Sequence, residues 1–302
     1  MADRSYAILD ARGIVTVGGA DRAEFLQGLV SNDVRRAGPE RAVWAAFLTP
    51  QGKYLHDFFT IEIGGAFHLD CEGGERLMDL GRGLSRYKLR SKVDLGIAEG
   101  HAVVALWGEG AADALGLADE PGAGRALDGG AAYVDPRLAA AGARAMLPKD
   151  RVAATLEPLG FAPATAEDYD RMRLGLGLPD GSRDMTVDRT ILLEANFDRL
   201  NGVDWDKGCY MGQELTARTR YRGLVKRRLV PVTVEGAAPA PGTKLTLDGR
   251  EAGEMRSSRG GLGIAMIRLD RLQEGGDLVL AAEGGATIRP RDVVWMAETP
   301  AS

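Results

Sequence analysis

The stretch that decides most about this sequence is Lys207-Gly208-Cys209-Tyr210-Met211-Gly212-Gln213-Glu214. It places one of only two cysteines between glycines, two residues after a lysine. Glycine lets a backbone turn tightly or approach another group closely. A thiol near positive charge can be a functional thiolate, whereas many free cysteines are simply buried as small apolar side chains. Spacing alone leaves both interpretations of Cys209 open.

Length and composition narrow the class of protein. The chain has 302 residues, enough for two or three domains of about 100–150 residues each. Its net charge of −5 argues against a general attraction to nucleic acid, so direct binding of tRNA is not expected. Cys71 and Cys209 are too few for a disulfide framework or a complete iron–sulfur site. We therefore expect a cytoplasmic protein without a permanently bound metal. No signal-like start or apolar run of about 18 residues suggests export or a membrane span.

Hydrophobic periodicity predicts mixed α and β structure before residue 226. Asp21 is placed to cap a helix, and residues 42–48 and 54–63 are predicted to pair as a hairpin. Further helices are predicted at residues 75–84, 111–117, 151–157 and 167–174. After Lys226 the pattern changes to short alternating strands, which predict a separate small barrel or sandwich. These strands are expected at residues 229–234, 244–247, 262–267 and 286–294.

Cations gather directly after the cysteine motif. Six lie within eleven positions: Arg218, Arg220, Arg222, Lys226, Arg227 and Arg228. If this segment is extended, its first three arginines lie on one face and could bind a phosphate, a glutamate tail or an RNA backbone. A solvated charged face is the alternative. A second basic cluster occupies residues 82–92.

Two further pairs of polar residues are candidates for chemistry. His56-Asp57 follows a predicted turn and could perform acid–base catalysis, although adjacent strand residues face opposite ways. Glu194 and Asn196 lie two positions apart. On one side of an extended segment, a carboxylate and an amide could recognise a heterocycle that carries donors and acceptors.

The octapeptide, continued by Leu215-Thr216-Ala217-Arg218, resembles the signature of the YgfZ family. These are folate-binding proteins related to the T-protein (aminomethyltransferase) of the glycine cleavage system. Mitochondrial relatives assist iron–sulfur cluster assembly. The resemblance extends over most of the chain, through residues 25–34, 48–57, 87–93 and 171–179.

The resemblance implies an α+β fold, an aminomethyltransferase-like ring of two intertwined αβ (ferredoxin-like) domains plus a C-terminal antiparallel β-barrel. Residues 1–225 would form the folate-binding region, divided into one domain from residues 1–95 and 165–225 and another from residues 96–164. Residues 226–302 would form the barrel. Tetrahydrofolate is expected in the central hole, because ligand sites often lie between domains.

The implied function is that of a tetrahydrofolate-binding accessory factor for assembly or repair of 4Fe–4S proteins, including iron–sulfur enzymes that modify tRNA. Partners would be iron–sulfur assembly proteins and client enzymes, and a monomer is expected. Cys209 would be the reactive thiol or a transient cluster ligand, with its reactivity raised by Lys207. Folate contacts are expected from Glu194, Asn196, Arg218, Arg220, Arg222, Tyr210, Gln213 and Glu214.

Two departures separate the chain from the T-protein. The T-protein has adjacent aspartates where this chain has His56-Asp57, and the glutamate of its Arg-Leu-Glu-Ala-Gly run is replaced by Gly175. Aminomethyl transfer requires proton transfer at the folate nitrogens. The loss of these carboxylates is therefore an argument against aminomethyl transfer by this chain. A folate-dependent aminomethyl or one-carbon transferase with His56 or Asp57 as base is the alternative function, and the sequence leaves open whether the chain is an enzyme.

Overall fold

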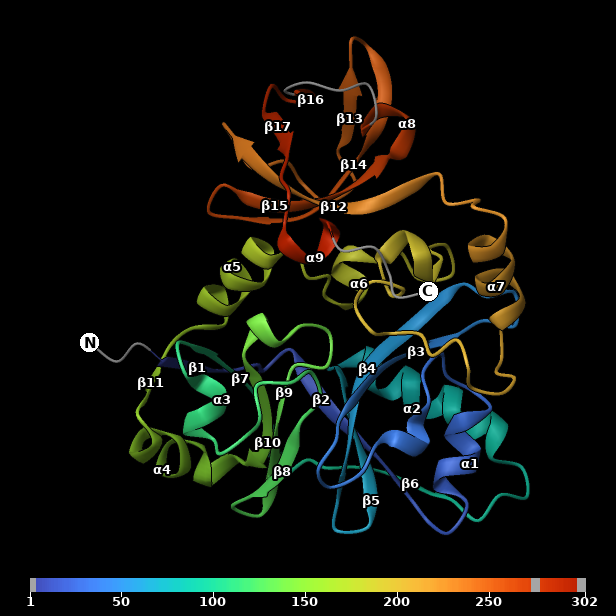
Figure 1. Ribbon diagram of the computed structural model, residues 1–302, viewed down its shortest axis with the longest axis vertical. Coiled ribbons are helices and arrows are strands. Elements are labelled where there is room, and N and C mark those ends of the chain that lie inside the picture. Colours follow the sequence, from blue (N-terminus) through green and yellow to red (C-terminus); the bar gives the residue numbers. More distant parts are fainter. Residues whose placement is uncertain (1–3, 273–277, 298–302) are drawn as a thin grey trace. The chain divides into compact units, whose positions relative to one another are not determined.

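The computed structural model describes residues 4–272 and 278–297 (Figure 1). The outer ends of the predicted first and last domains, residues 1–3 and 298–302, lie outside the described residues, as do residues 273–277. The chain divides into two units, and both are discontinuous in sequence. The first unit comprises Met1–Leu48, His56–Tyr169 and Asn201–Met211, and the second comprises Thr49–Leu55, Asp170–Leu200 and Gly212–Ser302.

The first unit contains a five-stranded sheet in the order β3-β4-β5-β2-β6. Its strands are β2 (Arg12–Gly18), β3 (Val43–Leu48), β4 (Tyr54–Ile63), β5 (Ala66–Glu72) and β6 (Asp94–Ile97). The predicted hairpin is confirmed at β3 and β4. Helix α2 (Glu75–Lys88) packs on β2, β5 and β6 and runs four residues beyond the predicted end at Leu84. The last turn carries the basic side chains Arg86 and Lys88, so the hydrophobic pattern did not indicate that the helix continues there.

A six-stranded sheet in the order β11-β1-β7-β10-β9-β8 completes the first unit. Its strands are β1 (Arg4–Ile8), β7 (His101–Gly108), β8 (Gly124–Leu127), β9 (Gly130–Val134), β10 (Ala143–Pro148) and β11 (Phe161–Pro163). β1 lies parallel to β11 and antiparallel to β7. The N-terminal strand therefore joins the sheet built mostly from residues 101–163, not the sheet formed by the rest of residues 1–95. A strand pattern in sequence does not identify the strand's partner.

Short helices complete the first unit. They are α1 (Arg22–Gln27), η1 (Val34–Arg36), α3 (Ala111–Ala114), η2 (Ala139–Ala141), η3 (Lys149–Arg151), α4 (Val152–Leu156) and η4 (Glu157–Leu159). Asp21 occupies the N-cap position of α1, as predicted, but its side chain makes no cap hydrogen bond. Its carboxylate instead accepts a hydrogen bond from the backbone N–H of Lys92 over 2.7 Å. The acid therefore attaches a distant loop to the start of the helix.

Buried charges connect the two sheets of the first unit. The fully buried carboxylate of Asp70 on β5 forms ion pairs with Arg12 on β2 and with Arg144 on β10. The Arg144 pair measures 2.6 Å from Nη2 to Oδ2. The ring of Phe59 lies 4.3 Å from the Arg144 guanidinium carbon and 5.6 Å from that of Arg12. Both cations are thus held between a carboxylate and an aromatic face, which compensates their desolvation.

The second unit contains a closed antiparallel barrel in the order β12-β15-β14-β13-β16-β17. Its strands are β12 (Arg227–Glu235), β13 (Lys244–Leu247), β14 (Arg250–Arg259), β15 (Leu262–Arg268), β16 (Leu280–Ala282) and β17 (Thr287–Pro290). The predicted strand at residues 286–294 is too long. After Pro290 the chain turns into helix α9 (Val294–Ala297), where the Trp295 indole N–H donates to the carbonyl of Leu176 over 2.7 Å.

Helices and an arginine network accompany the barrel. The helices are α5 (Ala166–Leu176), α6 (Gly181–Asp184), η5 (Leu192–Ala195), α7 (Gln213–Tyr221) and α8 (Leu269–Leu272). Buried Arg173 on α5 donates to Asp170 over 2.8 Å, to Asp184 over 2.5 Å and to Ser257 Oγ on β14 over 2.8 Å. These bonds fasten α5 and α6 to the barrel wall. Within the described ranges, no helix is long and apolar enough to cross a membrane.

Replacing Asp70 by Asn is expected to destabilise the protein by about 3–5 kcal/mol, because Arg12 and Arg144 then lose their buried counter-charge. Urea denaturation monitored by tryptophan fluorescence measures the change. Asp150→Asn, at an exposed position in η3, is the matched control and is expected to change stability by less than about 0.5 kcal/mol. Equal stabilities of the two variants would contradict the role given to Asp70.

Candidate functional site

The cysteine motif begins in a segment of the first unit, residues 201–211, that is bonded to the chain just after helix α1. Ser31 Oγ donates to the carbonyl of Gly202 over 2.6 Å, and the N–H of Asp204 donates to the carbonyl of Ser31 over 3.1 Å. The Asn32 amide donates to the carbonyl of Asn201 over 2.7 Å. Ser31 is fully buried. An irregular stretch of chain is thereby fixed by its polar contacts and not by a helix or strand.

Lys207 extends this attachment through its side chain. Its ammonium donates to the carbonyl oxygens of Gln27 at 3.0 Å, Val30 at 2.6 Å and Asn32 at 2.7 Å. The ring of Tyr210 lies 5.0 Å from the same nitrogen. Burial lowers the pKa of Lys207 to about 8, so the ammonium form still predominates at neutral pH. The side chain that the sequence suggested as an activator of the thiol is thus bound by backbone oxygens.

Cys209 is exposed near the end of this segment. Two residues later, the N–H of Met211 donates to the carbonyl of Gly28 over 3.0 Å. The segment is thus bound on both sides of the thiol to residues 27–32, the end of α1 and the turn after it, which we call the α1 turn. Cys71 is buried on β5, and burial raises its pKa to about 12. Cys209 is therefore the thiol that another molecule can reach, while activation of this thiol by Lys207 stays a prediction.

The second glycine of the motif has a steric role that can be located. Gly212, in the second unit, has φ +80°, and a Cβ added there would lie 2.5 Å from the carbonyl oxygen of Thr49. Gly52 approaches from the turn Thr49–Leu55, where an added Cβ would lie 2.6 Å from the Gly212 oxygen. The close backbone approach that glycine permits is therefore used at Gly212. A Cβ at Gly208 would meet no atom within 4 Å.

The cations that follow do not lie on an extended strand. Residues 213–221 form helix α7, so the prediction that Arg218, Arg220 and Arg222 share one face is wrong. In a helix, positions two apart point in nearly opposite directions. Gln213 is the first residue of α7, and exposed Glu214 accepts an ion pair from Arg218 over 3.7 Å. Arg220 is half-buried and Arg222 is exposed at the C-cap.

Glu194 and Asn196 also differ from their predicted setting. They lie in and after the short helix η5, not on an extended segment, and Asn196 adopts the left-handed conformation with φ +62°. Glu194 pairs with Arg227 over 2.8 Å. The Asn196 amide donates to the carbonyl of Leu229 over 2.8 Å and accepts from Arg228 over 2.9 Å. With these groups engaged and Asn196 fully buried, both residues connect η5 to β12.

The candidate bases on β4 are engaged separately. Asp57 is buried and accepts a hydrogen bond from the indole N–H of Trp44 over 2.9 Å. His56 contacts Asp79 through Nε2 at 3.1 Å, and burial lowers its pKa to about 4. His56 is therefore neutral at pH 7. The two neighbours do not act as a pair, as their positions on a strand indicated.

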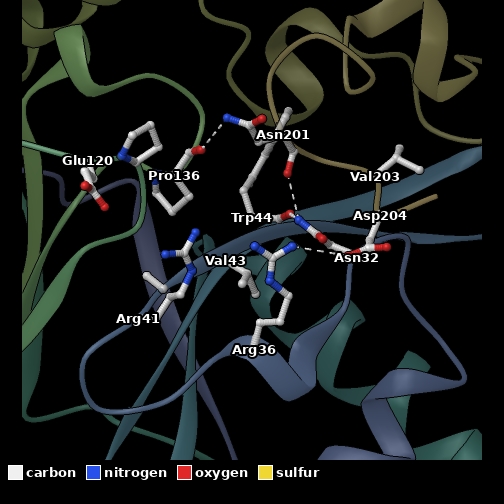
Figure 2. Close-up of a pocket in the computed structure, with 12 residues that line it drawn as sticks. Asn32, Arg36, Arg41, Val43, Trp44, Glu120, Pro136, Asn201, Val203 and Asp204 are labelled. Carbon is white, nitrogen blue, oxygen red and sulfur yellow. Dashed lines mark hydrogen bonds and ion pairs between the residues drawn. The ribbon is translucent and has the colours of Figure 1, made fainter. Parts of the chain in front are cut away.

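A cavity of about 400 Å³ in the first unit brings together several side chains that sequence reasoning missed (Figure 2). Trp44 is among its lining residues, and Arg36 and Arg41 project into it from the chain before β3. Arg36 contacts Asp204 over 3.3 Å, which connects the cavity to the cysteine segment. The remaining lining residues are Asn32, Ala42, Val43, Glu120, Pro121, Pro136, Asn201 and Val203. Two guanidinium groups at one cavity suit a molecule that carries an anionic tail.

No signal in the sequence identified this cavity. Arg36 follows Arg35 and Arg41 lies five residues later, before a predicted strand, without the dense spacing that drew attention to residues 82–92 and 218–228. Glu120 and Pro136 come from loops of the other sheet. Only the folded backbone places them beside Asn201.

Comparison with known proteins identifies the chain's relatives. Residues 226–298 match the family model for the CAF17 C-terminal beta-barrel domain. The mitochondrial iron-sulfur cluster assembly factor IBA57 of Mus musculus is 34% identical over 285 residues, covering 88% of this chain and 78% of that protein. The chain belongs to the YgfZ/IBA57 family. The Homo sapiens IBA57 protein is 33% identical over 304 residues, covering 93% of this chain and 81% of its own length.

The fold has a solved counterpart. The glycine cleavage system aminomethyltransferase T of Bartonella henselae superposes with a TM-score of 0.77 over 96% of this chain and 85% of that chain, at 16% identity. The aminomethyltransferase-like α+β fold with a C-terminal barrel is thereby confirmed. At this identity the likeness concerns the fold alone. In the described part of the chain, no three His, Cys, Asp or Glu side chains gather to hold a metal ion.

A prediction on pH follows from His56. The folded-state pKa of His56 is lowered to about 4, whereas the unfolded chain takes up a proton at this residue near pH 6.5. The folded protein therefore has its full stability above pH 6.5, and it loses stability as the pH falls from 6.5 towards 4. The full loss amounts to about 3 kcal/mol. His56→Gln does not titrate, so its urea stability is expected to fall less steeply over this range than that of the wild type. Parallel curves would contradict the assignment.

Proposed function

We propose that this protein is an accessory factor in the assembly or repair of iron–sulfur proteins and that Cys209 is its working thiol. Relatives that share about a third of its residues are named iron-sulfur cluster assembly factors. The observation that carries the proposal is the exposure of Cys209 on a segment bound to the α1 turn on both sides. A thiol presented in this way is open to another protein, whereas Cys71 is enclosed.

The chemistry of one thiol limits what the chain does alone. A cluster is usually held by four protein ligands, and Cys209 has no other cysteine beside it in the described structure. The cluster is therefore cargo, and a partner supplies the remaining ligands. We include 4Fe–4S enzymes, among them those that modify tRNA, as clients. We assign the protein to the cytoplasm as a monomer.

Tetrahydrofolate is the small molecule that we propose for the cavity at Trp44. Its volume of about 400 Å³ falls within the usual range for ligand sites. The valines and prolines in its lining offer apolar surface, and Arg41 and Arg36 offer cations to the carboxylates of a folate tail. When bound, tetrahydrofolate supplies nitrogen atoms that can carry a one-carbon unit. This cavity replaces Glu194 and Asn196 as the proposed folate contact, since both are engaged with β12.

The alternative, an aminomethyl or one-carbon transferase, gains no support from the candidate bases. Asp57 is engaged by the Trp44 indole, and neutral His56 contacts Asp79. A catalytic base must reach the proton it removes, and both side chains are buried in contacts of their own. We therefore retain the assembly role as the proposal.

Cys209→Ala is expected to abolish the recovery of 4Fe–4S enzyme activity when it is expressed in a strain lacking the native gene. Aconitase-type activity in extracts, normalised to the amount of soluble protein, is the measurement. Cys71→Ala is the matched control, because it removes the buried thiol, and it is expected to restore activity. Full recovery with Cys209→Ala would remove the thiol from the proposal.

Arg41→Ala is expected to weaken tetrahydrofolate binding by about tenfold to a hundredfold in calorimetry, because a charge-assisted contact is lost. Arg250→Ala, at an exposed position on β14, is the control and should bind as the wild type does. Unchanged binding by Arg41→Ala would exclude the cavity at Trp44. A loss confined to Glu194→Ala, with thermal stability unchanged, would instead return the site to η5.

A further inference from the structure

The surroundings of the Lys207 ammonium form a cation cradle, which we define as the carbonyl oxygens of Gln27, Val30 and Asn32 with the ring of Tyr210. Three oxygens lie 2.6–3.0 Å from the nitrogen, and the ring lies at 5.0 Å. The carbonyls belong to the end of α1 and the turn after it, where backbone oxygens lack helical donors. An ammonium has three donors, which matches the three oxygens.

The cradle has the composition of a monovalent-cation site. Neutral carbonyl oxygens and an aromatic face attract ammonium or potassium. Divalent ions prefer carboxylates, and here the carboxylates of Asp33 and Asp204 act on Lys207 only as nearby charges. Asp33 is engaged with Arg35 at 3.1 Å, and Asp204 accepts from the N–H groups of Asp206 and Lys207 at 2.9 Å.

We propose that Lys207 is a built-in monovalent cation that holds the Cys209 segment against the α1 turn. It is then a positioning residue for the thiol and not its acid–base partner. The cradle becomes a binding site for ammonium or potassium once the side chain is removed. The sequence suggested that Lys207 raises the reactivity of Cys209, and the cradle assigns its ammonium to the backbone instead.

The geometry explains why the thiol depends on this contact. The carbonyls bind the segment two residues before Cys209, and the Met211 N–H binds it two residues after. Gly208, between Lys207 and the thiol, is exposed and has no side chain that could pack against a neighbour. Glycine loses the most conformational freedom on ordering, so a fixed position for Cys209 requires a strong contact beside it. Lys207 supplies three charge-assisted hydrogen bonds at that place.

The test attaches a nitroxide spin label to Cys209 in the full chain. Cys71 is buried, so the folded protein is labelled at one thiol. Lys207→Ala is compared with the wild type and with Lys244→Ala, which removes an exposed lysine of β13. Each protein is measured in ammonium chloride and in tetramethylammonium chloride at equal ionic strength. Tetramethylammonium carries the same charge but cannot donate hydrogen bonds. Hydrogen exchange at the Met211 amide is followed in parallel.

We expect the label to be immobile in the wild type and in Lys244→Ala, and mobile in Lys207→Ala. The Met211 amide should exchange faster in Lys207→Ala by on the order of tenfold or more. Ammonium should restore both signals, and tetramethylammonium should not. A merely packed lysine would not give this selectivity. An immobile label and unchanged exchange in Lys207→Ala would overturn the proposal, as would equal effects of the two salts.

If Lys207→Ala does not fold, as judged by thermal melting, Lys207→Gln decides the matter by the same measurements. Its neutral amide offers two donors, so the label should be more mobile than in the wild type, and an immobile label would again overturn the proposal. The consequence for cluster handling rests on the function proposed above, but these measurements use neither iron nor folate. A failure here is therefore distinguishable from a failure of Cys209→Ala to lose activity.

Discussion

The first unit depends on one buried carboxylate that serves two arginines from different sheets. Asp70 receives Arg12 within its own sheet and Arg144 from the neighbouring sheet. Phe59 lies against both guanidinium groups. The chain also crosses between the two sheets, because β1 joins the six-stranded sheet and β2 the five-stranded one. The ion pairs join the two sheets, and loss of Asp70 would leave two buried guanidinium groups without their counter-charge.

The second unit uses charge in a similar way. Arg173 joins α5 and α6 to the barrel, and Arg227 and Arg228 join η5 to β12. The dense run of cations at residues 218–228 suggested an anion site in the sequence. Two of its members, Arg227 and Arg228, instead form contacts within the protein. Planar guanidinium groups with five donors suit this use, because one side chain can satisfy several acceptors. Arg41, which has no cationic neighbours in sequence, projects instead into a cavity.

Prediction from the sequence succeeded where a local pattern was sufficient. The strand at residues 54–63 was predicted with its observed bounds, because alternating apolar residues follow a turn that contains Gly52. It failed where charge spacing was used in place of hydrophobic period. Residues 213–221 form a helix, and the spacing of Arg218 and Arg220 carried no information about that. Asn196 was expected to face a ligand, but its amide satisfies the backbone of Leu229, a contact that depends on a residue 33 positions away.

The sequence by itself determined the family, because the octapeptide around Cys209 and the motifs that accompany it are long and specific. It also determined that one of two thiols lies in a glycine-flanked, cationic setting. Tertiary structure alone decided what Lys207 contacts. Its partners are carbonyl oxygens 175–180 residues earlier in the chain. Every residue carries a carbonyl oxygen, so a site built from backbone acceptors leaves no mark in the order of side chains and exists only once the turn after α1 has folded.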